Sequence, residues 1–253
     1  MLKFLRDTQL LFRRNLTNTL RNPVWVLMGL FQPILYLLLF APLLDGLPMP
    51  GFDQTNSLNI FAPGLLVMIS LFSAGFVGFG VIEDLRSGVV ERLRVTPASR
   101  LALLLGMVLR DVLILIVQCA LLVAVATLMG LRADPLGLLL LFGLIALLGL
   151  MMASASYALA LIFKDENALA ATLNAVMLPL QLLSGVLLPL TLAPKVIQML
   201  AQFNPFTHAV NAARALVNGQ LGDVSILIGF GVVAALAALA MFWATHIFRQ
   251  ATA

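Results

Sequence analysis

Long apolar runs separated by short polar segments fill most of the chain. Six runs are long enough, at about 20 residues, to cross the hydrocarbon core of a bilayer as helices. They cover approximately residues 24–44, 60–82, 112–131, 136–163, 168–188 and 224–248, with Met107 as an alternative start of the third. The runs are apolar on all faces and rich in Leu and Ala, which favours helices over the alternating strands of a membrane barrel. The pattern therefore predicts an all-α membrane protein with six transmembrane helices.

The composition agrees with lipid as the main solvent of the chain. Of the 253 residues, 62% are hydrophobic and 10% are charged, and the mean hydropathy is +1.06. A soluble domain has about 45–50% apolar and about 25% charged residues. These values argue against a soluble enzyme, a disordered segment or a nucleic-acid-binding protein. Because no repeat or low-complexity linker divides the sequence, residues 1–253 are expected to form one transmembrane domain.

The distribution of Lys and Arg predicts the orientation of the spans. If both termini are cytoplasmic, twelve of the fifteen basic residues fall in inner segments, and only Arg132, Lys195 and Arg214 fall in outer ones. Cytoplasmic segments of membrane proteins carry such an excess of positive charge. We therefore expect a multi-pass protein of the cytoplasmic (inner) membrane with both termini in the cytoplasm.

Residues 1–22 are predicted to form an amphipathic helix that ends at Asn22-Pro23. At 100° per residue, one narrow stripe collects the apolar residues Leu2, Leu5, Phe12, Leu16 and Leu20. The basic residues lie on the other side, the pattern of a helix in the membrane interface facing anionic headgroups. Two interpretations stay open, a simple topological anchor and a contact with a cytoplasmic partner.

The inner segment 83–100, EDLRSGVVERLRVTPASR, has a second amphipathic pattern. Leu85, Val89 and Leu93 recur every four residues, and Pro97 stops the helix that this spacing predicts. Charged residues lie off the apolar stripe. A short cytoplasmic helix of this kind can dock into a groove of another protein, and packing on the membrane surface is the alternative.

The outer segment 189–223 is too long for a turn and too broken to span the membrane. Two short helices are predicted, at 194–203 and about 206–217, with Asn204-Pro205 between them. Such a pair can enter the outer leaflet and return if protein covers the broken backbone. His208 is expected to be an ordinary interfacial polar residue.

Sequence motifs for catalysis or nucleotide binding are absent. The chain has no G-x-x-x-x-G-K-[ST] phosphate loop, no H-E-x-x-H zinc motif and no G-x-S-x-G nucleophile elbow. No catalytic residue and no metal site are therefore predicted. Arg110 and Asp111, at the expected start of the third span, are interpreted as a structural ion pair, and Ser154 and Ser156 as helix-packing residues.

The order of these parts resembles the type-2 ABC exporter permease family, which includes bacterial drug, lipid and polysaccharide export permeases. The resemblance covers essentially the whole chain. The local marks are NIFAPGLLVM (59–68), GVVERLRVTPASR (88–100), LSGV (183–186) and NPFTHAVNAARALVNG (204–219). The second and fourth marks are the more specific.

The resemblance implies a half-transporter that pairs with a second copy, as a homodimer, or with a close paralogue. Two copies of a cytoplasmic ABC ATPase subunit would bind ATP and Mg, and this chain would bind no cofactor itself. The helix in segment 83–100 would then be the coupling helix that contacts the ATPase. Its implied contact residues are Leu85, Val89, Glu91, Arg92, Leu93, Arg94 and Pro97.

In relatives, the second and fifth spans line the substrate path, and the outer helices form a re-entrant hairpin that acts as a gate. The resemblance thus implies a path at Phe72, Phe76, Phe79, Met177 and Gln181. It implies an extracellular gate at Asn204, Pro205, Phe206 and Arg214. The nearly charge-free spans favour an amphiphilic or hydrophobic cargo, such as a drug, a lipid or a lipid-linked glycan.

Two other classes of function stay open. A secondary transporter or channel would require coupling acids or a polar ring at mid-depth in the spans. A membrane-embedded lipid-modifying enzyme would require convergent polar groups, for which His208 with Asp223 or Asn211 is the best set available.

Overall fold

The computed structural model describes residues 2–21, 24–44, 57–88, 100–186, 190 and 193–251. The regular elements in these ranges are all helices. Their bounds are α1 (Leu2–Arg21), α2 (Val24–Leu44), α3 (Ser57–Gly75), α4 (Gly78–Arg86), α6 (Arg100–Leu128), α7 (Pro135–Phe163), α8 (Glu166–Leu183), α9 (Lys195–Gln202), α10 (Pro205–Val217) and α11 (Val224–Ala251). The predicted all-α class is confirmed.

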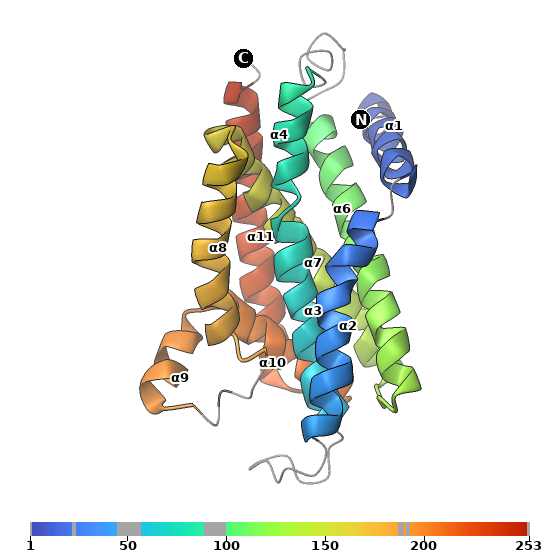
Figure 1. Cartoon of the computed structure of the whole chain (residues 1–253), viewed down its shortest axis with the longest axis vertical. Coiled ribbons are helices and arrows are strands. Elements are labelled where there is room, and N and C mark those ends of the chain that lie inside the picture. The colour runs from blue at the N-terminus through green and yellow to red at the C-terminus, as the bar shows by residue number, and fades with distance from the viewer. Residues whose placement is uncertain are drawn as a thin grey trace.

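The long helices run side by side and give the bundle two distinct ends (Figure 1). One end, called the terminal end below, holds α1, the end of α4 and the end of α11. The opposite end, called the hairpin end, holds α9 and α10. Helix α7 contacts α3, α4, α6, α8, α10 and α11, and its residues Leu144, Leu148 and Tyr157 are almost fully buried. Helix α7 is therefore the centre of the core.

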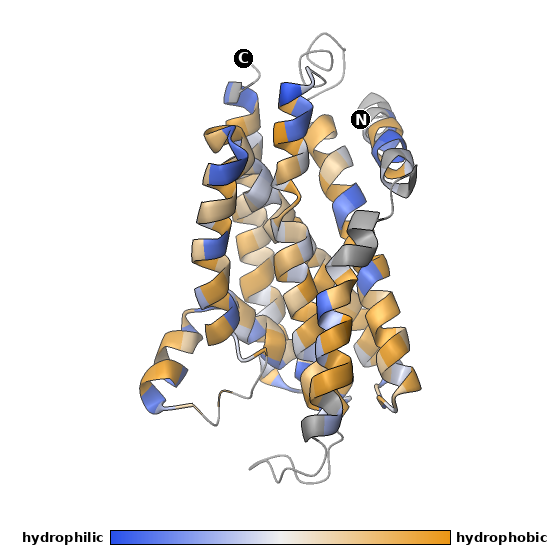
Figure 2. Cartoon of the chain, in the orientation of Figure 1, coloured by the Kyte–Doolittle hydropathy of each residue, from blue (hydrophilic) through white to orange (hydrophobic). Residues whose placement is uncertain are grey.

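Among the described residues, four helical segments are long and apolar enough to cross a membrane. They are Ser57–Arg86, Ala102–Leu128, Pro135–Phe163 and Val224–Gln250. The apolar colour is concentrated at mid-height of the bundle, and hydrophilic residues gather toward its two ends (Figure 2). The chain is thus a multi-pass membrane protein. The other two predicted spans also form helices, α2 with a described apolar stretch at Gly29–Phe40 and α8 with the polar residues Asn174 and Gln181.

The second predicted span is interrupted, contrary to the expectation of one continuous helix over 60–82. It begins earlier, at Ser57, and breaks at Phe76 and Val77 between α3 and α4. Glycines lie on both sides of the break, at Gly75 and Gly78. Glycine is the weakest helix former after proline, and without a Cβ it lets neighbouring helices approach closely.

The third predicted span was placed too late in the chain. Helix α6 begins at Arg100, and no proline between Arg100 and Met107 interrupts it. Arg110 and Asp111 therefore lie well inside α6, not at its start. The fifth span was predicted to end at residue 188, but α8 ends at Leu183, because Gly185 turns the chain with a φ of 72°.

Helix formation at the N-terminus and in the predicted outer segment is confirmed. Helix α1 packs closely on α6, since a Cβ added to Gly106 would lie 2.9 Å from the Leu11 Cβ atom. Helices α9 and α10 agree with the predicted pair to within a residue or two at each end. Asn204 begins α10 as its N-cap, with Pro205 at the first helical position, where proline is well tolerated.

Candidate functional site

Three of the four sequence marks meet at the hairpin end. The Arg214 side chain donates from Nε to the Ile60 carbonyl oxygen at 3.0 Å and from Nη2 to the Gly185 carbonyl oxygen at 2.8 Å. Nearby, the Asn59 amide donates to Asn218 Oδ1 at 3.1 Å. We call these five residues the outer polar cluster, because the sequence predicts this end of the bundle to face outward. It joins segments 59–68, 183–186 and 204–219, which are far apart in sequence.

One of the remaining predicted gate residues, Asn204, and the nearby Thr207 link the start of α10 to the end of α8. Asn204 Nδ2 donates to the Leu180 carbonyl oxygen at 2.7 Å, and its Oδ1 accepts the Phe206 backbone N–H at 3.0 Å. Thr207 adds a bond from Oγ1 to the Leu183 carbonyl oxygen at 3.0 Å. Phe206 is only 2% exposed. Helix α10 is thus an integral part of the bundle.

Helix α9, by contrast, projects from the hairpin end (Figure 1). Its apolar residues Val196, Met199 and Leu200, together with the following Phe203, are each more than half exposed. One link to α10 is the 2.9 Å contact between His208 Nε2 and the Gln202 carbonyl oxygen. The two helices of the hairpin end therefore differ, since α10 is packed on the bundle and α9 lies at its edge.

The guanidinium of Arg214 is held by carbonyl oxygens. None of the described Asp or Glu residues forms an ion pair with it. Burial lowers the pKa of Arg214 to about 10, because desolvation disfavours the charged form. The group still carries its proton at neutral pH, so α10 brings a positive charge to the point where α3 and the end of α8 meet.

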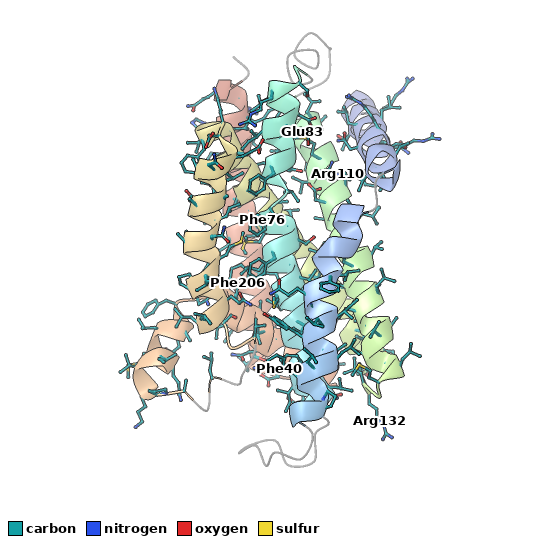
Figure 3. All side chains as sticks on the ribbon, in the orientation of Figure 1. Phe40, Phe76, Glu83, Arg110, Arg132 and Phe206 are labelled. Carbon is teal, nitrogen blue, oxygen red and sulfur yellow. The ribbon has the colours of Figure 1, made fainter. Side chains whose placement is uncertain are left out.

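Replacing Arg214 with Met is expected to lower the free energy of unfolding by about 2 kcal/mol, because two carbonyl oxygens lose their donor. Thermal unfolding in detergent measures the change. The control is Arg132→Met, which removes an exposed arginine at the same end (Figure 3) and is expected to have little effect. Equal losses in the two variants would contradict the role of the outer polar cluster.

The predicted path residues on α3 and α4 form a ladder of aromatic rings across the helix break. The ring centroids of Phe72 and Phe76 are 6.2 Å apart, and those of Phe76 and Phe79 are 5.8 Å apart. Interplanar angles of 13° and 15° make both pairs stacked. Figure 3 shows Phe76 near mid-height, with Glu83 and Arg110 toward the terminal end.

The path residues on α8 lie against the same segment. Met177 is 2% exposed, and its Cε occupies the space beside Gly75, where an added Cβ would lie 2.0 Å away. Gln181 Nε2 contacts Met68 Sδ at 3.4 Å. All five predicted path residues thus belong to one region where α3, α4 and α8 adjoin.

Most of the predicted ATPase contacts lie outside the described residues. These are Val89, Glu91, Arg92, Leu93, Arg94 and Pro97. Leu85 belongs to α4, which ends at Arg86 before a turn through Ser87 and Gly88. At this end Arg86 and Glu166 form an ion pair with an N–O distance of 2.6 Å, which links α4 to the first turn of α8.

The sequence predicted only part of a buried polar cluster between α6 and α7. Arg110 and Asp111 form the expected ion pair, with an N–O distance of 2.6 Å. The Tyr157 hydroxyl donates to Asp111 Oδ2, and Arg110 Nη2 donates to the Tyr157 oxygen at 3.2 Å. Tyr157 is 1% exposed and was not singled out from the sequence. The sequence feature that could have indicated Tyr157 is its rarity, because the chain has two tyrosines and this one interrupts an apolar run.

Sequence reasoning also missed Asn59 and Asn218, and it assigned Ser156 to packing alone. Asn59 additionally donates to the Arg132 carbonyl oxygen at 2.9 Å. Ser156 accepts a hydrogen bond from the Gly78 backbone N–H at 2.9 Å. Within the described ranges, no group of three or more His, Cys, Asp and Glu residues could hold a metal ion.

Comparison with known proteins identifies the family to which this chain belongs. A family model described as ABC-2 type transporter matches residues 6–218. The chain therefore belongs to the ABC-2 type transporter family and is a transmembrane permease of the ABC transporter class. This agrees with the family that the sequence marks resemble.

The chain is similar to permeases from bacterial and algal sources. It is 30% identical over 227 residues to the daunorubicin resistance ABC transporter permease protein DrrB1 of Streptomyces coeruleorubidus, covering 87% of this chain and 79% of the relative. It is 29% identical over 238 residues to the protein named "Putative transport permease ycf38" of Pyropia yezoensis, covering 90% of this chain and 80% of the relative. A ycf38 protein of Cyanophora paradoxa is 27% identical over 216 residues, covering 84% and 74%.

Proposed function

We propose that this chain is the membrane-spanning half of an ATP-driven exporter in the cytoplasmic membrane. It would cross the membrane six times, with α2 and α8 completing the four apolar helices, and with the terminal end in the cytoplasm. The match to the ABC-2 type transporter family over residues 6–218 carries the proposal. The excess of Lys and Arg in the predicted inner segments supports the orientation.

The proposed assembly contains two permease chains and two ATPase subunits. Permeases of this family normally work with an ATPase subunit. The ATPase would bind ATP and Mg, because this chain carries no phosphate loop. The segment after α4 would contact the ATPase through Glu91, Arg92 and Arg94. The second permease chain would be a copy of this one or a close paralogue.

The proposed cargo is amphiphilic or hydrophobic. The aromatic ladder of Phe72, Phe76 and Phe79 offers stacked apolar rings within the apolar segment Ser57–Arg86. The similarity to a drug-resistance permease points the same way. In this proposal α9 and α10 close the outer end of the path, with α10 held by the outer polar cluster.

A charge reversal tests the ATPase contact. The permease carrying Glu91→Arg is co-purified with the ATPase encoded nearest to its gene, and ATP hydrolysis is measured in lipid nanodiscs. We expect the wild-type pair to form a stoichiometric complex and the variant to lose most of its permease-dependent hydrolysis, because the reversed charge disrupts the electrostatic match at the proposed contact. The matched control is Asp53→Arg, which makes the same charge change in the predicted outer loop.

The two possible failures have different meanings. If the wild-type chain binds no ATPase in any nucleotide state, the proposal of an ATP-driven exporter is wrong. If the complex forms and Glu91→Arg behaves like Asp53→Arg, the exporter stands, but the assignment of Glu91 to the contact does not.

A further inference from the structure

The helix break at Phe76 and Val77 lies inside an apolar segment, Ser57–Arg86, that is otherwise helical and long enough to cross a membrane. Within lipid, a backbone N–H without a partner is costly, so a break persists only where the freed groups find other partners. Two short-range bonds cover part of the gap, from the Phe79 N–H to the Phe76 oxygen at 3.2 Å and from the Gly80 N–H to the Val77 oxygen at 3.1 Å.

A side chain from another helix satisfies the N–H of Gly78. Ser156 on α7 accepts it at 2.9 Å, and both residues are buried. An added Cβ at Gly78 would lie 2.6 Å from Ser156 Oγ and 2.7 Å from the Ser156 carbonyl oxygen. Only glycine permits this approach, so Gly78 and Ser156 together form a pivot at the start of α4.

The two sides of the break are held differently. Helix α3 is buried along nearly its whole length and joins the outer polar cluster through Asn59 and Ile60. Helix α4 has nine residues, of which Gly78, Val81 and Ile82 are buried. Its far end is tied to α8 by the ion pair of Arg86 and Glu166, whose side chains are 58% and 44% exposed. An exposed ion pair contributes at most about 1 kcal/mol to stability, so the contact between Arg86 and Glu166 can break easily.

We propose that α4 moves as a separate lever about the pivot of Gly78 and Ser156, and that Ser156 is a positioning residue for transport. A nine-residue helix is about 13 Å long, so a small rotation at the pivot displaces its far end by several ångströms. That end leads directly into the proposed ATPase-contacting segment, and the aromatic ladder crosses the pivot at Phe76. Motion of α4 therefore couples the ATPase to the path without disturbing α3. This inference rests on the proposed function.

Hydrogen–deuterium exchange on the purified permease tests the pivot without any partner. We expect residues 76–86 to exchange faster than residues 57–75, and Ser156→Ala to accelerate residues 76–86 about tenfold by removing one hydrogen bond. Ser154→Ala is the matched control, since Ser154 is buried on the same helix and contacts Met241 Sδ instead. Equal exchange in the two variants would overturn the proposal.

A reversible cross-link tests whether the motion is needed. Arg86→Cys and Glu166→Cys are combined and bridged with a thiol-cleavable bis-methanethiosulfonate reagent in the permease–ATPase complex, where the single native cysteine, Cys119, is fully buried. We expect ATP hydrolysis to fall at least fivefold on cross-linking and to recover on reduction. Each single-cysteine variant treated with the same reagent is the control.

An undiminished rate of ATP hydrolysis in the cross-linked complex would contradict the proposal that α4 must move. Complex formation is measured on the same samples. An intact complex whose ATP hydrolysis is unchanged by the cross-link contradicts the lever motion of α4 but not the proposed function. Absence of a complex contradicts the proposed function, and the exchange measurement then decides the pivot by itself.

Discussion

Replacing Asp111 with Asn is expected to lower the free energy of unfolding by about 4 kcal/mol, because removing one partner leaves the other charge of a buried pair uncompensated. Asp111 accepts bonds from both Arg110 and Tyr157, and its side chain is only 4% exposed. The cluster joins α6 to α7, the centre of the core. Titration with a denaturing detergent, followed by circular dichroism, measures the loss.

Two further variants distinguish the contribution of the polar interactions to stability from that of side-chain packing. Tyr157→Phe keeps the ion pair and is expected to lose about 1 kcal/mol, the usual contribution of one hydrogen bond. The triple variant Arg110→Met/Asp111→Leu/Tyr157→Phe removes all three polar groups and should regain most of the stability, because an apolar replacement of a buried pair is often neutral. A triple variant as unstable as Asp111→Asn would show that the charges themselves stabilise the helix pair.

Replacing Gly137 with Ala is expected to destabilise the protein by about 3 kcal/mol, since overpacking against backbone cannot be relieved by a rotamer change. An added Cβ would lie 1.9 Å from the carbonyl oxygen of Leu216, so α7 and α10 must separate. The measurement is the midpoint of thermal unfolding in detergent. We expect the change to loosen the hairpin end first, because Leu216 belongs to α10.

The same helix provides the control for this substitution. Gly143 also lies on α7, but an added Cβ there would meet only the Phe230 ring, at 3.9 Å, which is ordinary contact. Gly143→Ala is therefore expected to be neutral, or to stabilise by up to about 1 kcal/mol through helix propensity. If both variants were destabilised alike, the close approach of α7 and α10 would not be the cause.

The apolar runs predicted the helices well because helix length and polarity are local properties. The fourth run, 136–163, agrees with α7 to within one residue, since Pro135 and the N-cap Asp134 mark its start. The start of the third run was misplaced, because Arg110 and Asp111 were interpreted as a boundary. The two charges compensate each other, and both groups hydrogen-bond to Tyr157, which is 46 or 47 residues away. A helix can bury charges that are paired and hydrogen-bonded in this way.

The candidate site was only partly predictable for the same reason. The marks at 59–68, 183–186 and 204–219 were recognised one by one, yet nothing local indicates that Arg214 reaches Ile60, 154 residues earlier. The break in the second span was missed because its cause is also distant. Gly75 and Gly78 look like packing glycines until Met177 and Ser156 are placed beside them.

The sequence by itself determined that the chain is an all-helical membrane protein, where most of its helices lie, and which family its marks resemble. These features depend on composition, on run length and on residues such as Asn204-Pro205 that act on their own neighbours. Only the tertiary structure decided that Gly78 donates its N–H to Ser156, 78 residues away, and that Arg214 joins three segments. A hydrogen bond between helices depends on which faces meet, and that choice is made by the packing of the whole bundle.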